Sequence, residues 1–265
     1  MRHVGAIAGR EIRSYFTSPV AYAVLVLFSL LGGFFFVLQL SSFNAAIAFY
    51  QQTQQMEALA SVNLNDYLIF GFYQLMWLVL LILVPGLTMG LFSTEKANAT
   101  EELLLTSPVT IWEIVLGKYL AAAAMVTLLV AVLAALTGIL FAYGDPEPWQ
   151  TAAGLLGVWL VGLAYAAVGS FTSSVTRSPL IAFFFAVFLL FLFFMLGPAA
   201  DMGMAGSTGG DAGGLLAALR WLSSEGHFNE LTTGLVDTRS LAYFGFLIGV
   251  FLLLTKASVE SVRWR

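Results

Sequence analysis

The chain has 265 residues, of which 60% are hydrophobic and only 10% are charged, and its mean hydropathy is +0.90. These are too few charged groups to cover a soluble globule of this size, so the composition indicates an integral membrane protein. The acidic pI of about 5.1 argues against nucleic acid as a partner, and the absence of cysteine excludes disulfides and cysteine-based metal sites.

Residues 1–19 are expected to form an amphipathic helix at the membrane interface. Their apolar positions recur at helical spacing, whereas Arg10 and Arg13 lie elsewhere and suit an anionic leaflet. Glu11 falls within the apolar arc and has two interpretations. The favoured one is a carboxylate at headgroup level paired with a nearby Arg or Lys, and the other is a buried charge that locks this helix to a cytoplasmic loop.

Six apolar runs follow, each long enough at ~1.5 Å per residue to cross ~30 Å of hydrocarbon. None contains Asp, Glu, Lys, Arg or His, which ion-coupled carriers and intramembrane hydrolases keep at depth. The sequence therefore predicts an all-α integral membrane protein, a single domain over residues 1–265, with six transmembrane helices and no catalytic role. The expected spans are residues 20–40, 67–92, 119–143, 150–172, 180–197 and 241–255.

The loop at residues 93–118 is the long charged interruption between the second and third spans. Thr100 is placed to cap a helix whose first turn holds Glu101 and Glu102, where carboxylates favour the positive end of the helix dipole. Pro108 ends that helix because it has no N–H to donate. The apolar residues of this short helix are Leu103, Leu104 and Leu105.

A second helix is expected to begin directly after this proline. Thr110 and Glu113 have the T-x-x-E spacing of a capping box, and the helix continues through Gly117 and Lys118 into the third span. The order EK, T-x-E-LLLTSP and EIVLGK resembles the loop between the second and third spans of ABC exporter permeases of the O-antigen and drug exporter class. In that family the loop contains the coupling helix that docks on the ATPase subunit, so the resemblance implies that residues 100–108 contact an ATPase.

The fourth span is rich in small residues. Small side chains at close spacing let helices approach one another, either within one subunit or across a dimer. The positions are Gly154, Gly157, Gly162, Ala166 and Gly169.

The outer side is expected to carry three connections. Residues 41–66 are polar and Gln-rich, with apolar positions that indicate a helix lying on the surface, and residues 144–149 form a tight proline turn. Residues 199–240 are the longest outer segment, glycine-rich at first and then helical before the last span.

The outer segment ends in WLSSEGHFNELTTGLVDTRSLAYF. Ser224 is expected to cap a short helix that Gly234 ends, and Asp237 is expected to cap the last span. The HF…G-hydrophobic-VDTR-S-L-x-YF arrangement, which includes Phe228 and Arg239, resembles the outer segment of permeases in gliding-motility and copper-enzyme-maturation ABC systems. The chain's start, REIRSYFTSPVAY, and its end, ESVRWR, resemble the same subfamily.

His227 and Asp237 also allow a metal or acid–base interpretation. A metal site needs three or four convergent ligands, and the sequence supplies no others nearby. An ordinary hydrogen bond for His227 and a helix cap for Asp237 are therefore favoured.

The placement of Lys and Arg predicts the orientation. Of 11 such residues, all except Arg220 and Arg239 fall on one side of the six spans. Both termini are therefore expected in the cytoplasm, in a multi-pass protein of the bacterial inner membrane.

The chain contains no GxxxxGK[ST] phosphate loop, so ATP and Mg²⁺ would bind to a separate ATPase chain. The resemblance implies the permease subunit of an ATP-driven ABC transporter, paired with cytoplasmic ABC ATPase subunits and with a second permease subunit, identical or related, in the lipid bilayer. Two alternatives stay open. One is a force transducer that acts on a periplasmic partner without moving a solute, and the other is a stand-alone six-span channel or structural membrane protein.

Overall fold

The computed structural model describes residues 2–57, 62–100, 109–206 and 212–261. Within these ranges there is no strand, and six helices are long and apolar enough to cross a membrane, which confirms the predicted all-α integral membrane protein. The elements are α1 (Arg2–Thr17), α2 (Pro19–Gln52), the π-helical turn η1 (Asn65–Ile69), α4 (Phe70–Thr88), α5 (Gly90–Ala97), α7 (Ile111–Tyr143), α8 (Pro148–Val175), α9 (Pro179–Gly206), α10 (Ala212–Leu222), α11 (Ser224–Thr232) and α12 (Thr238–Ser261).

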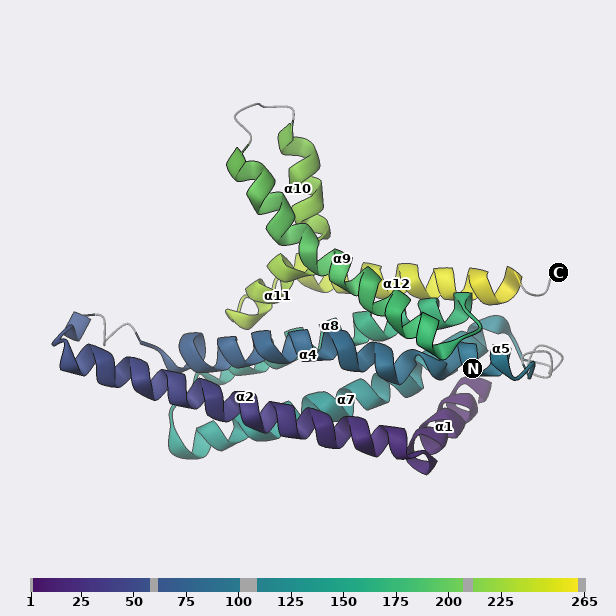
Figure 1. Ribbon diagram of the computed structural model, residues 1–265, viewed down its shortest axis with the longest axis horizontal. Helices are drawn as coiled ribbons and strands as arrows, with labels where there is room; N and C mark the ends of the chain where they lie inside the picture. Colours follow the sequence, from purple (N-terminus) through teal and green to yellow (C-terminus); the bar gives the residue numbers. More distant parts are fainter. Residues whose placement is uncertain (1, 58–61, 101–108, 207–211, 262–265) are drawn as a thin grey trace.

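The long helices lie side by side along one axis, and both termini lie at the same end of this bundle, which we call the terminal end (Figure 1). α1 is inclined to that axis and turns sharply into α2. α9 crosses the bundle, and its last part pairs with α10 in a hairpin that projects away from the long axis.

α8 is the central helix of the bundle. Of its most apolar window, 72% is buried inside the protein, against 22% for the corresponding windows of α2 and α9. α8 therefore forms the core, whereas α2 and α9 present most of their apolar surface outward, as helices facing lipid or another subunit do.

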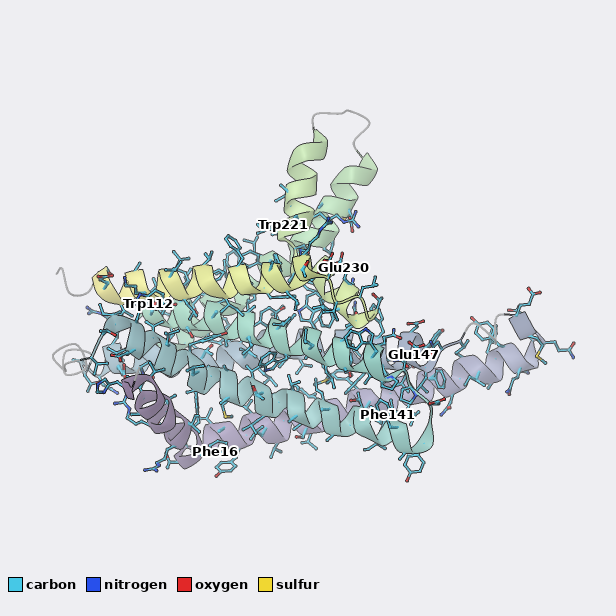
Figure 2. All side chains as sticks on the ribbon, turned by 180° about the vertical axis from the view of Figure 1, so that it is seen from behind. Phe16, Trp112, Phe141, Glu147, Trp221 and Glu230 are labelled. Atoms are coloured by element: carbon cyan, nitrogen blue, oxygen red, sulfur yellow. The ribbon has the colours of Figure 1, made fainter. Side chains whose placement is uncertain are left out.

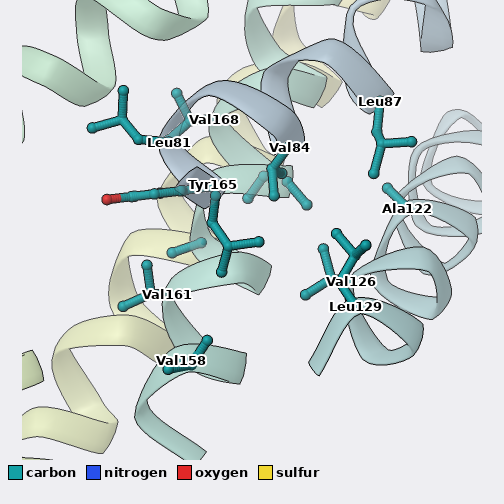
Figure 3. Close-up of a cluster of buried hydrophobic side chains, with 14 of the residues drawn as sticks. Leu81, Val84, Leu87, Ala122, Val126, Leu129, Val158, Val161, Tyr165 and Val168 are labelled. Carbon is teal, nitrogen blue, oxygen red and sulfur yellow. The ribbon is translucent and has the colours of Figure 1, made fainter. Parts of the chain in front are cut away.

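The core lies where α4, α7 and α8 meet (Figure 3). Val84, Val126 and Val161, one from each of these helices, are buried. The indole N–H of Trp77 donates a hydrogen bond of 2.6 Å to the Tyr165 hydroxyl, so the polar atoms of these two buried rings are paired within the apolar core.

Glycines of α8 allow this close packing. A Cβ atom added to Gly162 would lie 2.6 Å from Cγ1 of Val126 on α7, and one added to Gly154 would lie 2.5 Å from the ring of Tyr73 on α4. Both distances are well below van der Waals contact. The small residues of the fourth span were predicted to pack either within one subunit or across a dimer, and Gly154 and Gly162 pack within one subunit.

The first span is longer than the sequence predicted. α2 runs unbroken over Pro19–Gln52, whereas we expected the span to end at residue 40 and residues 41–66 to lie on the surface. The helix continues because the segment SSFNAAIAFYQQ contains neither proline nor glycine to end it.

The fifth span also continues past its predicted end at residue 197. α9 passes through Pro198 and ends at Gly206. A proline removes one backbone hydrogen bond but does not end a helix that tertiary contacts support. Here a Cβ atom on Gly197 would lie 2.6 Å from the Ser223 hydroxyl, so the loop before α11 packs directly on this turn.

We predict that Gly162→Ala destabilises the protein by about 1–3 kcal/mol, because the added methyl group overpacks the contact with Val126. Gly138 is the matched control, since nothing lies within 4 Å of a Cβ atom at that mid-helix glycine. Gly138→Ala should be neutral or stabilising, by up to about 1 kcal/mol, because alanine favours helix. Thermal unfolding in detergent, followed by tryptophan fluorescence, measures both changes, and equal shifts would contradict the prediction.

Candidate functional site

A buried lysine lies at the terminal end of the bundle. Lys118 of α7 is 1% exposed, and its ammonium group has three acceptors: Glu95 Oε1 at 2.9 Å, Glu11 Oε1 at 3.2 Å and the Leu91 carbonyl at 2.6 Å. The Phe92 ring lies 5.3 Å from the same nitrogen. Three acceptors match the three N–H donors of an ammonium group, so this buried charge is fully satisfied.

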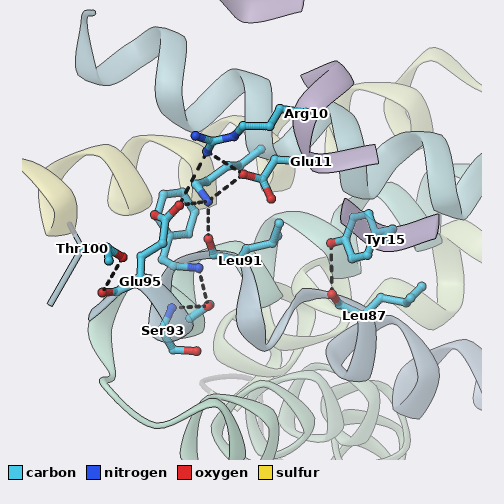
Figure 4. A network of polar contacts seen from close by, with 11 residues as sticks. Arg10, Glu11, Tyr15, Leu87, Leu91, Ser93, Glu95 and Thr100 are labelled. Carbon is cyan, nitrogen blue, oxygen red and sulfur yellow. Dashed lines mark hydrogen bonds and ion pairs between the residues drawn. The ribbon is translucent and has the colours of Figure 1, made fainter. Parts of the chain in front are cut away.

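Lys118 and its charged neighbours join three helices (Figure 4). We call this group the lysine cluster, and its members are Arg10, Glu11, Glu95 and Lys118. Glu11 comes from α1, Glu95 from α5 and Lys118 from α7. Arg10 extends the cluster to the surface, with Nη2 2.9 Å from Glu11 and 3.7 Å from Glu95. Arg13, the other basic residue expected at the leaflet, is exposed. Glu11 is 16% exposed and pairs with the neighbouring Arg10, as the first interpretation expects, and also with a buried lysine of another helix, so it shares the position expected by the second.

Two further contacts fix α1 in place. A Cβ atom on Gly117 would lie 2.7 Å from Cγ2 of Ile7, so α1 approaches the backbone of α7 directly beside the cluster. The hydroxyl of Tyr15 donates to the Leu87 carbonyl at 3.0 Å. Burial raises the pKa of Tyr15 well above its usual range, and the nearby Glu11 carboxylate adds to this shift, so the phenol stays a donor.

The start of α5 is attached to α8 through one hydroxyl. Ser173 Oγ accepts hydrogen bonds from the backbone N–H groups of Phe92 and Ser93, at 3.0 and 3.1 Å, and donates to the Met89 carbonyl at 2.8 Å. Backbone groups near a helix junction need such partners when they are buried. Ser173 therefore holds the α4–α5 junction against the central helix.

The chain leaves α5 through a tight turn, which begins the loop between α5 and α7. Ala99 has a φ of +55°, the N–H of Thr100 donates to the Glu95 carbonyl at 3.0 Å, and that of Ala99 donates to the Lys96 carbonyl at 3.4 Å. This is a Schellman motif, with alanine where glycine is usual. The other predicted coupling residues lie outside the residues that the structure describes: Glu101, Glu102, Leu103, Leu104, Leu105 and Pro108.

The loop enters α7 through the predicted capping box, which is confirmed. The Thr110 hydroxyl accepts from the N–H of Glu113 at 3.3 Å, and the Glu113 carboxylate accepts from the N–H of Thr110 at 3.2 Å. The ends of the loop are therefore ordered by local hydrogen bonds and closed at their base by the ion pair between Glu95 and Lys118.

The profile of one protein family, described as ABC-2 family transporter protein, matches residues 5–259. The chain belongs to the ABC-2 transporter family. ABC-2 permeases are typically non-catalytic membrane subunits that associate with ABC ATPase subunits, in agreement with the multi-pass helical fold. No curated protein matches the chain.

The segment before the last span of this ABC-2 protein, which was predicted to lie on the outer side, is organised around His227 of α11. Its Nδ1 lies 3.1 Å from the Ser240 hydroxyl, its Nε2 lies 3.2 Å from the Trp221 carbonyl, and its ring stacks on Tyr243 at 4.3 Å. Ser240 in turn donates to Glu230 at 2.6 Å. Trp221 and Glu230 lie at the base of the α9–α10 hairpin (Figure 2). In the described part of the chain, no three His, Cys, Asp or Glu side chains are grouped to hold a metal ion.

The cap of α11 differs from the prediction by one residue. Ser223, not Ser224, is the N-cap, and its hydroxyl accepts from the N–H of Glu225 at 3.2 Å. Adjacent serines have the same capping chemistry, so the sequence could not choose between them. The end of the helix is as predicted, because Gly234 follows its last turn with a φ of +86°.

Two other predicted residues of the outer segment, Asp237 and Phe228, have structural roles. Asp237 caps α12, accepting from the N–H of Arg239 at 3.2 Å, and this hydrogen bond lowers the pKa of Asp237. Arg239 itself is exposed. Phe228 is fully buried, with its ring 4.9 Å from that of Trp77, so it anchors α11 to the bundle.

Three residues of these contacts were not among the functional candidates expected from the sequence: Lys118, Glu95 and Ser173. A signal for Lys118 was present, since it follows Ile111 by seven residues and Ile114 by four, the spacing of one helix face. Both isoleucines are buried, so the lysine falls on the apolar face of α7. Glu95 carried no comparable signal, because its partner is distant in sequence.

We predict that Lys118→Met destabilises the protein by about 3–5 kcal/mol, because removing the cation leaves Glu11 and Glu95 facing each other, with only Arg10 nearby. Lys256→Met is the control: Lys256 is partly exposed and pairs with Glu260 within one helix, so its loss should cost under about 1 kcal/mol. Thermal unfolding in detergent measures both. A triple variant, Lys118→Met with Glu11→Gln and Glu95→Gln, should recover part of the loss, and no recovery would show that charge pairing is not the cause.

Proposed function

We propose that this chain is the permease subunit of an ATP-driven ABC transporter, which couples ATP hydrolysis on separate ATPase subunits to export or conformational work across the bacterial inner membrane. ATP and Mg²⁺ would bind to the ATPase chains, and a second permease subunit, identical or related, would complete the membrane part. Family membership supports this function, and one observation carries the proposed coupling: the ion pair that closes the base of the loop between α5 and α7.

That ion pair places the loop at a mechanical junction. Glu95 precedes the loop and Lys118 follows it, and their contact at 2.9 Å makes the two ends move together. Glu11 carries the connection to α1, and Ser173 carries it to α8. A force applied to residues 101–108 would therefore reach the interface helix and the central helix through contiguous contacts.

The proposed coupling element is a short helix over residues 101–108, with Thr100 at its start. A helix of this length is not stable alone, so it needs a partner surface. A groove on the ATPase subunit would take one of the three leucines, and Glu101 or Glu102 would face a basic residue at its rim.

The coupling element is tested by Leu104→Asp, with the same change at its two neighbours Leu103 and Leu105. Burial of one leucine contributes about 1.5–3 kcal/mol, and an aspartate in its place strands a charge. At least one of the three variants should insert at normal abundance yet lose co-purification of the ATPase or its stimulation by the permease. Val236→Asp, at a partly exposed position of the outer segment, is the control and should keep both. If all three leucine variants keep docking and ATPase stimulation, the loop is not the coupling element.

The orientation is tested by protease protection in intact cells. The distribution of Lys and Arg supports a cytoplasmic position for the terminal end of the bundle. Tags at the two termini should be protected from external protease, and a tag inserted at residues 206–210 should be cleaved. The reverse pattern would place the loop at residues 93–118 outside and exclude contact with a cytoplasmic ATPase.

A force transducer without solute transport is the second candidate. The observation that favours it is the α9–α10 hairpin, which projects from the bundle and is braced at its base by His227. Such an arm would transmit motion of α9 and α12 to a periplasmic partner. Two results together would favour this candidate over export. The permease would stimulate ATP hydrolysis without a transported solute, and deletion of residues 203–213 would abolish that stimulation.

A further inference from the structure

A cavity of about 600 Å³ lies between α1, the beginning of α2 and the junction of α4 with α5. Its lining changes in character along its length. Arg10, Glu11 and Glu95 are charged, whereas Val20, Gly86 and Leu87 are apolar. A volume of this size is typical of sites for small molecules.

The cavity exists because α1 and α2 meet at an elbow, and because Gly86 and Gly90 add no side chain to its opposite wall. Ser18 caps α2 by accepting from the N–H of Val20 at 3.3 Å, which sets the sharp turn between the two helices.

The charged groups of the cavity have donors and acceptors beyond those used in the lysine cluster. Lys118 and Arg10 approach only Oε1 of Glu11 and Oε1 of Glu95, so the second oxygen of each carboxylate lies outside these contacts. Arg10 uses only Nη2, and its side chain is 58% exposed, which leaves further N–H donors. The cavity thus offers carboxylate oxygens and a guanidinium group side by side, with no net charge from these four residues.

We infer that this cavity binds the headgroup of a phospholipid that carries a primary amine, that is, phosphoethanolamine. The ammonium group would donate to Glu11 and Glu95, and the phosphate would accept from Arg10. The acyl chains would leave past Val20, which is 45% exposed on the first turn of the long apolar helix α2.

The cluster's charge balance selects among the common lipid headgroups. A purely anionic headgroup would meet two carboxylates, and a choline headgroup has no N–H to donate to them. A soluble phosphoethanolamine would fill only the charged end of the cavity. The site therefore fits a zwitterionic lipid with a primary amine, and such a lipid would tie the α1–α2 elbow to α5. This inference does not depend on the proposed coupling to an ATPase.

The site is tested by native mass spectrometry of the purified chain in mild detergent. Three lipids are added in equimolar amounts: phosphatidylethanolamine, phosphatidylcholine and phosphatidylglycerol. Ser14→Phe places a large ring in the cavity from a lining position, and Thr17→Phe places the same ring at an exposed position of α1 outside it. Arg10→Gln removes the phosphate partner, and Arg13→Gln is its control.

We expect phosphatidylethanolamine to be retained in preference to the other two lipids. Ser14→Phe and Arg10→Gln should each lower its occupancy by about fivefold or more, as expected for loss of a charge-assisted contact, while both controls keep it. Any of three results would overturn the inference: equal retention of all three lipids, preference for phosphatidylglycerol, or an occupancy of phosphatidylethanolamine that is unchanged in both Ser14→Phe and Arg10→Gln. Displacement of the lipid by an equal concentration of soluble phosphoethanolamine would also overturn it, because the apolar end would then contribute nothing.

Discussion

A single buried ammonium group determines how the terminal end of this protein is assembled. Lys118 of α7 has almost no exposure to water that could replace its partners, so α1 must supply Glu11, and α5 must supply Glu95 and the Leu91 carbonyl. Removing one of the two carboxylates leaves this buried charge less well compensated in an apolar surrounding. The positions of the interface helix, of the charged loop and of the third span are thus not independent of one another. Replacing a buried ion pair by apolar residues is often neutral for stability, whereas removing one partner is costly, so the pair constrains the arrangement as long as both partners are present.

The core of the bundle depends on a different constraint, which is the absence of side chains. α8 is central because its glycines allow α4 and α7 to pack against its backbone, and the valines of Figure 3 fill the remaining space. Packing of this type is the main source of helix association in a membrane, where the hydrophobic effect between helices is weak. The ammonium cluster and the glycine contacts therefore act at different depths: the first fixes one end of the bundle, and the second fixes its middle.

Much of the fold could be predicted from the sequence, because long apolar runs and capping residues are local signals. The six spans, the capping box of Thr110 and Glu113, and the end of α11 at Gly234 all follow from such signals. The continuation of α2 to Gln52 could not be predicted from hydropathy, because polar residues do not end a helix that has left the apolar layer. The lysine cluster could not be predicted because its members are brought together only by the fold, although the position of Lys118 on an apolar face was a readable sign.

The length of α2 has a mechanical consequence. Its 34 residues, at ~1.5 Å each, make a rod of about 50 Å, whereas the hydrocarbon layer is ~30 Å thick. A pivot of this rod would lie at the elbow by Ser18, where α2 leaves α1. A rotation of about 10° at that pivot would displace the opposite tip by about 9 Å, if the helix stays straight at ~1.5 Å per residue. Small rearrangements beside the lysine cluster would thus be magnified into large excursions of the far end of α2, and they would also displace Phe28 and Phe36, which α2 buries in the core.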